Sequence, residues 1–240
     1  MTDDVKLPRR VCPVIFLLDT SGSMRGDPIG AVNAAIEGVL PELKSMNEEN
    51  ADAEIMIGIL TFSSGSYWVS GESLVTPANY THIDLDANGP TDMGDAFRKL
   101  NEKLSSKTGF MTRASGSVAP VLFLLSDGAP TDDYQSGLAK LKSNSWYKVA
   151  ARVAIGYGEL CDDAVLQEFT GNEETVLHTR EPQELLKMIK FVTITSSMVA
   201  SRGSNSNNEQ SSPDDNTAKV AQEIHAQEGE LAEQDDIDDF

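Results

Sequence analysis

Two apolar runs of nearly the same sequence, residues 11–18 and 118–125, constrain the fold of this chain most strongly. The first reads Val-Cys-Pro-Val-Ile-Phe-Leu-Leu and the second Val-Ala-Pro-Val-Leu-Phe-Leu-Leu. Such unbroken apolar runs are typical of strands buried on both faces of a parallel sheet. Each run ends in an acidic turn, so we expect two neighbouring strands that bring carboxylates to the same edge of a sheet.

The rest of the chain alternates between strand and helix patterns, which favours a doubly wound α/β fold. The class that we expect is a mostly parallel six-stranded sheet with one short antiparallel edge strand at 67–69 and helices on both faces. Pro41 should kink or end the first helix early. The other strands are expected at 53–62, 149–155 and 175–178, and the helices at 27–46, 93–104, 133–142, 163–169 and 182–196.

The net charge of −19 makes nucleic acid an unsuitable partner, because phosphate binding needs a basic face. Basic partners or metal cations fit better. Residues 198–240 are rich in Ser, Asn, Gln, Asp and Glu and lack the apolar residues for a core, so we expect a disordered acidic tail. Within that tail, Val220, Ile224 and Leu231 have the spacing of a weak amphipathic helix that a partner could order.

The cysteine content and the apolar segments bear on the cellular compartment. Cys12 and Cys161 lie far apart, and residues 1–6 do not read as the start of a secretion signal, so we expect reduced thiols and a cytoplasmic protein. Apolar runs are too short for a transmembrane helix, and we therefore expect no membrane association.

The turn after the first strand, Asp19-Thr20-Ser21-Gly22-Ser23, carries the clearest chemical signal. Asp19, Ser21 and Ser23 can direct three oxygens at one point, and oxygen ligands suit a hard cation, Mg²⁺ first and Mn²⁺ or Ca²⁺ after it. The pentapeptide by itself is equally compatible with a polar turn whose Asp or Ser caps the next helix.

Two further residues favour the metal interpretation. Ligands of doubly wound sheets bind beyond the carboxyl ends of the strands, where the strand order reverses. Asp127 follows the second apolar run, in Ser126-Asp127-Gly128, and so should lie beside Asp19. Thr91 precedes a helix at the same edge and supplies a natural fifth oxygen.

Taken together, these three segments resemble the von Willebrand factor A family over residues 7–197, and its metal-ion-dependent adhesion site (MIDAS) matches Asp19, Ser21, Ser23, Thr91 and Asp127. The resemblance implies that Ser21 and Ser23 bind the metal directly and that Asp19 and Asp127 bind it mostly through water. It also implies that Thr91 binds the metal directly or through water, depending on whether a ligand is present. Residues 17–24 and 125–133 look like the bacterial TerY type, which is associated with tellurium-resistance and stress loci. One departure is Pro90, which could restrain the loop of Thr91.

The expected function is therefore a cytoplasmic, Mg²⁺-dependent protein-binding module that captures an Asp or Glu carboxylate of a partner. Resemblance to the TerY type adds a kinase or phosphatase as a partner and a role in stress or phosphorylation signalling. The competing hypothesis is a metal-dependent phosphohydrolase of the haloacid dehalogenase kind, with Asp19 as nucleophile. That chemistry needs a second carboxylate two positions later as general acid, and the residue there is Ser21. We therefore expect no enzyme activity.

Overall fold

The computed structural model describes residues 9–50, 53–112, 116–159, 161–202 and 216–226. Its centre is a six-stranded sheet with the order β3-β2-β1-β4-β5-β6, in which every neighbouring pair is parallel except the antiparallel pair of β2 and β3. The expected fold class is confirmed. The strands are β1 Arg10–Asp19, β2 Ala53–Ser63, β3 Gly65–Trp68, β4 Val121–Ser126, β5 Ala151–Tyr157 and β6 Val176–Thr179.

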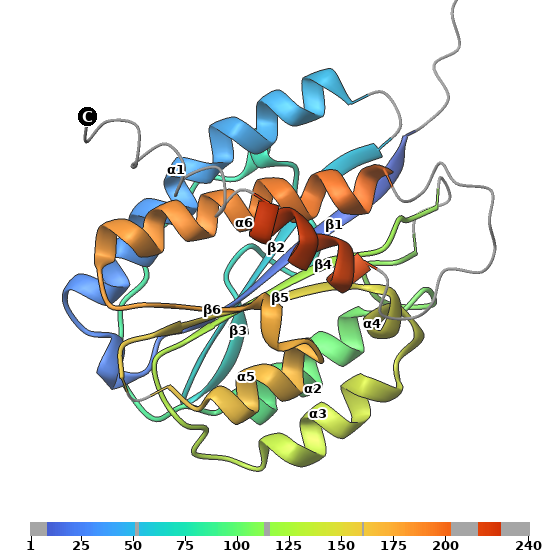
Figure 1. The fold of residues 1–240 in the computed structure, drawn as a ribbon. Helices are drawn as coiled ribbons and strands as arrows, with labels where there is room; N and C mark the ends of the chain where they lie inside the picture. Colours follow the sequence, from blue (N-terminus) through green and yellow to red (C-terminus); the bar gives the residue numbers. More distant parts are fainter. Residues whose placement is uncertain (1–8, 51–52, 113–115, 160, 203–215, 227–240) are drawn as a thin grey trace, which may run out of the picture.

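Helices cover both faces of the sheet in a three-layer arrangement (Figure 1). One face packs against α1 and α6 through residues such as Ile36 and Ile189, and the other packs against α2, α3 and α5 through residues such as Phe97 and Phe169. The helices are α1 Asp27–Glu49, α2 Met93–Lys103, α3 Tyr134–Ser143, α4 Ser145–Val149, α5 Asp163–Thr170 and α6 Pro182–Arg202.

The two apolar runs become the central strands β1 and β4, which pair in parallel with Leu18 opposite Leu125. Their neighbouring positions are confirmed, and the strand order reverses between them because β2 lies on the other side of β1. Strand β4, formed by the second apolar run, begins at Val121, directly after Pro120 and three residues later than expected. Proline has no N–H to donate to a ladder, so its position before the strand is the favourable one.

Of the two outcomes expected for Pro41, the early end of the first helix does not occur, since α1 continues to Glu49 with Pro41 inside it. Val39 and Leu43, on either side of the proline, are completely buried in the same core cluster. Packing of this apolar face outweighs the hydrogen bond that proline removes, which is why the helix does not end at Pro41.

The C-terminal segment also departs from the expectation. Helix α6 extends to Arg202, and residues 216–226 form a further helix that packs on the sheet face covered by α6. Val220 and Ile224 are buried in that core, and the Thr217 hydroxyl donates a hydrogen bond to the Ala150 oxygen (3.1 Å) and accepts one from the Arg152 amide (3.2 Å). The amphipathic spacing therefore finds its partner within the chain. The remaining tail residues, including Leu231, lie outside the described residues.

No helix in the described part of the chain combines the length and the apolar character that crossing a bilayer requires.

Candidate metal centre

The turn after β1 is fixed by its own aspartate. Asp19 is completely buried, and its Oδ1 accepts a hydrogen bond from the Ser21 amide (2.8 Å). This bond holds the turn so that the Ser21 and Ser23 hydroxyl oxygens lie 3.0 Å apart. An Asp side chain that bonds to the backbone two residues on is a common turn device, and here it leaves two hydroxyls side by side.

The end of β4 completes the same cluster. The Ser126 hydroxyl donates to Asp19 Oδ2 (2.6 Å), and the Ser23 hydroxyl donates to Asp127 Oδ1 (2.8 Å). Four of the five predicted site residues, Asp19, Ser21, Ser23 and Asp127, thus form one connected group, which we call the oxygen cluster. The pairing of β1 with β4 brings these residues together from positions more than a hundred residues apart in sequence.

Thr91 lies on a loop that is bonded to the turn. The Gly22 amide donates to the Gly89 oxygen (2.9 Å), and the Asn88 amide donates to the Thr20 oxygen (2.8 Å). Gly89 has a φ of +84°, which favours glycine in this loop. In the part of the chain that the structure describes, the Thr91 hydroxyl has no hydrogen-bond partner, although the residue is buried.

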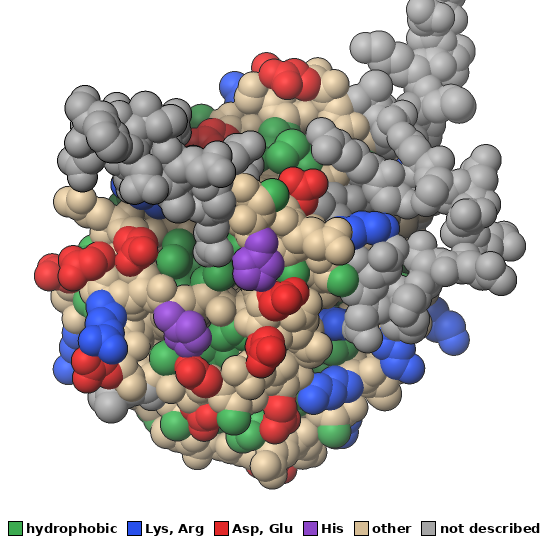
Figure 2. Space-filling view, viewed as in Figure 1, with side chains coloured by type: hydrophobic (Ala, Val, Ile, Leu, Met, Phe, Trp, Pro, Cys, Tyr) green, Lys and Arg blue, Asp and Glu red, His purple; other side chains and the backbone are tan. Residues whose placement is uncertain are grey.

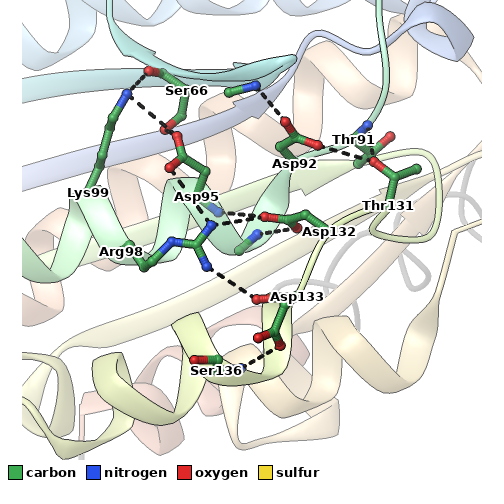
Figure 3. Close-up of polar contacts among 12 residues, drawn as sticks. Ser66, Thr91, Asp92, Asp95, Arg98, Lys99, Thr131, Asp132, Asp133 and Ser136 are labelled. Atoms are coloured by element: carbon green, nitrogen blue, oxygen red, sulfur yellow. Dashed lines mark hydrogen bonds and ion pairs between the residues drawn. The ribbon is translucent and has the colours of Figure 1, made fainter.

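A second set of bonds holds the Thr91 loop against the segment that follows β4 (Figure 3). The Thr91 amide donates to Thr131 Oγ1 (2.9 Å), and the Thr131 amide donates back to the Thr91 oxygen (2.9 Å). Asp132 accepts from the amides of Gly94 (2.8 Å) and Asp95 (2.9 Å) and so caps the start of α2 from another segment. The three segments of the candidate site are thereby joined through hydrogen bonds.

Sequence reasoning did not assign roles to Ser126, Thr131 and Asp132. Asp92, the residue before α2, makes no side-chain cap of that helix and instead accepts from the Gly65 amide (2.7 Å). Asp133 caps α3, where its side chain accepts from the Ser136 amide. A cap supplied by a distant segment leaves no local spacing signal, whereas Asp133 and Ser136 have the ordinary spacing of a cap.

Burial shapes the electrostatics of the oxygen cluster. Loss of hydration raises the pKa of Asp19 to about 6, although hydrogen bonds from Ser126 and Ser21 oppose that rise. The pKa of Asp127 is raised for the same reason, with an opposing hydrogen bond from Ser23. Among the described residues, neither carboxylate forms an ion pair with Lys or Arg. Two buried carboxylates without a cation are a place where a divalent ion fits.

The sequence profile of the von Willebrand factor type A domain matches residues 14–190, which is most of the chain and nearly the whole sheet with its helices. The chain belongs to the von Willebrand factor type A family. A search of curated proteins returns no match.

Several solved structures share this fold at low sequence identity. Proximal thread matrix protein 1 of the mussel byssus, with a zinc-occupied MIDAS motif, is 19% identical with a TM-score of 0.58, and the match covers 77% of this chain and 48% of that one. A von Willebrand factor type A protein of Catenulispora acidiphila is 19% identical (TM-score 0.57; 79% and 43% covered). The pilus adhesin SpaC of Lactobacillus rhamnosus GG is 14% identical (TM-score 0.60; 77% and 30% covered). This chain therefore spans less than half the length of these proteins.

In this von Willebrand factor A domain, the five predicted residues offer two carboxylates and three hydroxyls, an all-oxygen set of the kind that hard cations prefer. The Asp19 carboxylate accepts hydrogen bonds from Ser21 and Ser126, and its two oxygens together retain lone-pair capacity for a metal or a metal-bound water. The residues present thus fit a divalent ion in both charge and donor type.

Proposed function

We propose that this protein is a metal-dependent protein-binding module in which Asp19, Ser21, Ser23, Thr91 and Asp127 hold Mg²⁺, with Mn²⁺ or Ca²⁺ as substitutes. The observation that carries the proposal is the connected oxygen cluster, whose two buried carboxylates have no basic partner among the described residues. The zinc-occupied MIDAS of the mussel protein supports a divalent ion at the matching place.

The charges explain why such a site would bind a partner. Two carboxylates balance a divalent ion, and the hydroxyls add dipoles without charge, so the ion stays electrophilic and keeps an exchangeable position. A carboxylate from another protein fills that position well, because acidic oxygen is the preferred ligand of hard cations. The partner that we propose therefore presents an exposed Asp or Glu.

We propose no catalytic role for this site. A phosphohydrolase with Asp19 as nucleophile would need a carboxyl group at position 21, whereas the Ser21 hydroxyl pairs with the Ser23 hydroxyl. Sustained hydrolysis of a phosphate ester, abolished in Asp19→Asn, would overturn this part of the proposal.

The membership in the TerY type is also proposed, on the basis of the motifs in residues 17–24 and 125–133. It places the protein in the cytoplasm, in a stress or tellurium-resistance system, with a kinase or phosphatase as partner. Affinity capture from a native lysate, with and without EDTA, tests this finer proposal. Capture of a kinase or phosphatase only when Mg²⁺ is present supports it, and capture that is indifferent to EDTA contradicts it.

The primary test is calorimetric titration of the purified full chain with Mg²⁺ and Mn²⁺. We expect saturable binding that Asp19→Ala and Ser21→Ala abolish. Asp86→Ala is the matched control, since Asp86 is exposed on the loop that leads to Thr91 and lies outside the oxygen cluster. Absence of Mg²⁺ and Mn²⁺ binding, or binding that survives Asp19→Ala, would refute the proposal at its first step.

A further inference from the structure

A second group of metal-ligating side chains lies at the carboxyl ends of β5 and β6. Cys161 follows β5, Asp163 is the first residue of α5, and His178 lies in β6. Cys161 Sγ lies 3.4 Å from Asp163 Oδ1 and 3.7 Å from His178 Nδ1, and His178 Nε2 lies 3.7 Å from Asp163 Oδ1. One ligand atom from each residue can be chosen so that all three lie within 4.8 Å of one another.

The sheet places this group on the same edge as the oxygen cluster but at a separate position. Ser126 of β4 lies opposite Gly156 of β5, and Gly156 lies opposite His178 of β6. With neighbouring strands about 4.8 Å apart, the backbone of His178 is about 10 Å from that of Ser126. One ion could not be shared at that separation, so the second group would hold an ion of its own.

Gly156 makes room for the group. A Cβ at this position would lie 2.8 Å from both Cys161 Sγ and His178 Nδ1, which is closer than carbon approaches either atom without displacement. Any other residue at this position, near the carboxyl ends of β5 and β6, would push the sulfur and the imidazole away. The thiol and the ring thus occupy the space of a missing side chain and face each other across it.

From this geometry we propose that Cys161, Asp163 and His178 bind a divalent transition-metal ion, with Zn²⁺ as the foremost candidate. Bonds of about 2.0–2.3 Å from a tetrahedral zinc to sulfur, nitrogen and oxygen separate its ligands by roughly 3.3–3.8 Å. With His178 binding through Nδ1, the distances from Cys161 Sγ to Asp163 Oδ1 (3.4 Å) and to His178 Nδ1 (3.7 Å) fall in this range, whereas the 3.7 Å contact of Asp163 is with the other ring nitrogen, Nε2. Thiolate and imidazole favour Zn²⁺ over Mg²⁺, the reverse of the oxygen cluster.

The surroundings suit a cation with one open coordination position. The three residues line a surface pocket of about 770 Å³ together with Glu159, Glu181, Glu184 and Arg180. Arg180 is paired with Glu159 (2.6 Å), so the charge of the pocket remains acidic. On the face drawn in Figure 2, acidic side chains lie close to the visible histidines. Three protein ligands that open onto a pocket leave the fourth position to water or to a side chain of a partner.

Titration of the full chain with Co²⁺, in reducing buffer with excess Mg²⁺ to occupy the oxygen cluster, tests the proposal. Cobalt bound to a thiolate gives a near-ultraviolet charge-transfer band that an all-oxygen site does not give. We expect the band in the wild type, its loss in Cys161→Ser, and its displacement by Zn²⁺. Cys12→Ala is the matched control and keeps the band, because Cys12 is completely buried in β1.

His178→Ala and Asp163→Asn replace exposed side chains and should each weaken Co²⁺ binding by about tenfold or more, with circular dichroism unchanged. Gly156→Ala should weaken binding to a similar degree by displacing the sulfur and the ring. The proposal is overturned if the wild type shows no thiolate band, if the band survives Cys161→Ser, or if neither His178→Ala nor Asp163→Asn changes the affinity. Because the readout is specific to sulfur, its failure says nothing about Mg²⁺ binding by the oxygen cluster.

Discussion

The oxygen cluster and the group of Cys161, Asp163 and His178, which we call the Cys161 group, both lie at the carboxyl ends of the strands, yet they are built differently. The first lies at the carboxyl ends of the two central strands. Its two aspartates and Ser21 are buried, Ser23 is exposed, and its carboxylates are held by hydroxyls and an amide. The second is half-exposed between an edge strand and the start of α5, and its members contact mainly one another. Position in the sheet explains the contrast, since a central strand pair excludes water whereas an edge strand opens onto a pocket.

The strongest test of this comparison is a double dissociation. Asp19→Ala should abolish Mg²⁺ binding and leave the cobalt–thiolate band unchanged. His178→Ala should weaken Co²⁺ binding by about tenfold or more and leave Mg²⁺ binding unchanged, because the two groups share no residue. Calorimetry with Mg²⁺ and absorption with Co²⁺, on both variants, measure this. If either substitution weakens both ions, the two groups form one coupled site and the comparison fails.

A large but partial effect is expected for Asp132→Ala, which removes the acceptor for the amides of Gly94 and Asp95 at the start of α2. Two unsatisfied amides should lower the free energy of unfolding by about 1–3 kcal/mol. Loosening of the neighbouring Thr91 loop should weaken Mg²⁺ binding by roughly tenfold. Thermal unfolding and calorimetry measure the two quantities.

Asp133→Ala is the control for this prediction, because Asp133 caps only α3. It should cost about 1 kcal/mol of stability and leave Mg²⁺ affinity unchanged. Equal Mg²⁺ affinities for the two variants would show that the hydrogen bonds of Asp132 do not position Thr91.

The two groups should also respond differently to pH. Burial raises the pKa of Asp19 to about 6, so protons compete with Mg²⁺ below that pH and the affinity should fall roughly tenfold between pH 7 and pH 5. Burial and the neighbouring Asp163 raise the pKa of Cys161 to about 11. The Cys161 thiol must lose a proton to bind Zn²⁺, and the Zn²⁺ affinity should therefore continue to rise above pH 7. The Mg²⁺ affinity should be level in that range.

Titrations at pH 5, 6, 7 and 8 distinguish these profiles. A Mg²⁺ affinity that does not change between pH 5 and 7 would exclude Asp19 as the competing base. A Zn²⁺ affinity that levels off near pH 6 would show that the thiolate is not a ligand.

The smallest effect on either group is expected from Ile224→Ala. Ile224 lies in the helix of residues 216–226, which bonds to Ala150 and Arg152 near the start of β5, at the opposite edge of the sheet. Loss of buried apolar volume should reduce stability by about 1–3 kcal/mol without changing Mg²⁺ or Co²⁺ affinity. Gln222→Ala, on the exposed side of the same helix, should change neither. A change in metal affinity on Ile224→Ala would reveal coupling between the two edges.

The oxygen cluster could be predicted because it depends on a repeated apolar strand. Residues 11–18 and 118–125 indicate two buried parallel strands, and topology then brings Asp19 and Asp127 together. Ser126, Thr131 and Asp132 were missed since their partners lie on other segments, at no fixed spacing in sequence. Pro41 gives a second example of what local sequence cannot predict. Proline favours the end of a helix, but α1 continues through Pro41 because Val39 and Leu43 pack in the core.

The sequence by itself determined the order of the six strands and of helices α1, α2, α3, α5 and α6, the central position of the two apolar runs and the donor types of the candidate metal centre. Only the tertiary structure decided that Cys161 and His178 meet across Gly156, and that Val220 and Ile224 have a partner within the chain. Periodicity and apolar runs record what each segment buries, and that information is local. Which distant side chains share one space depends on strand register and helix packing, which no single segment specifies.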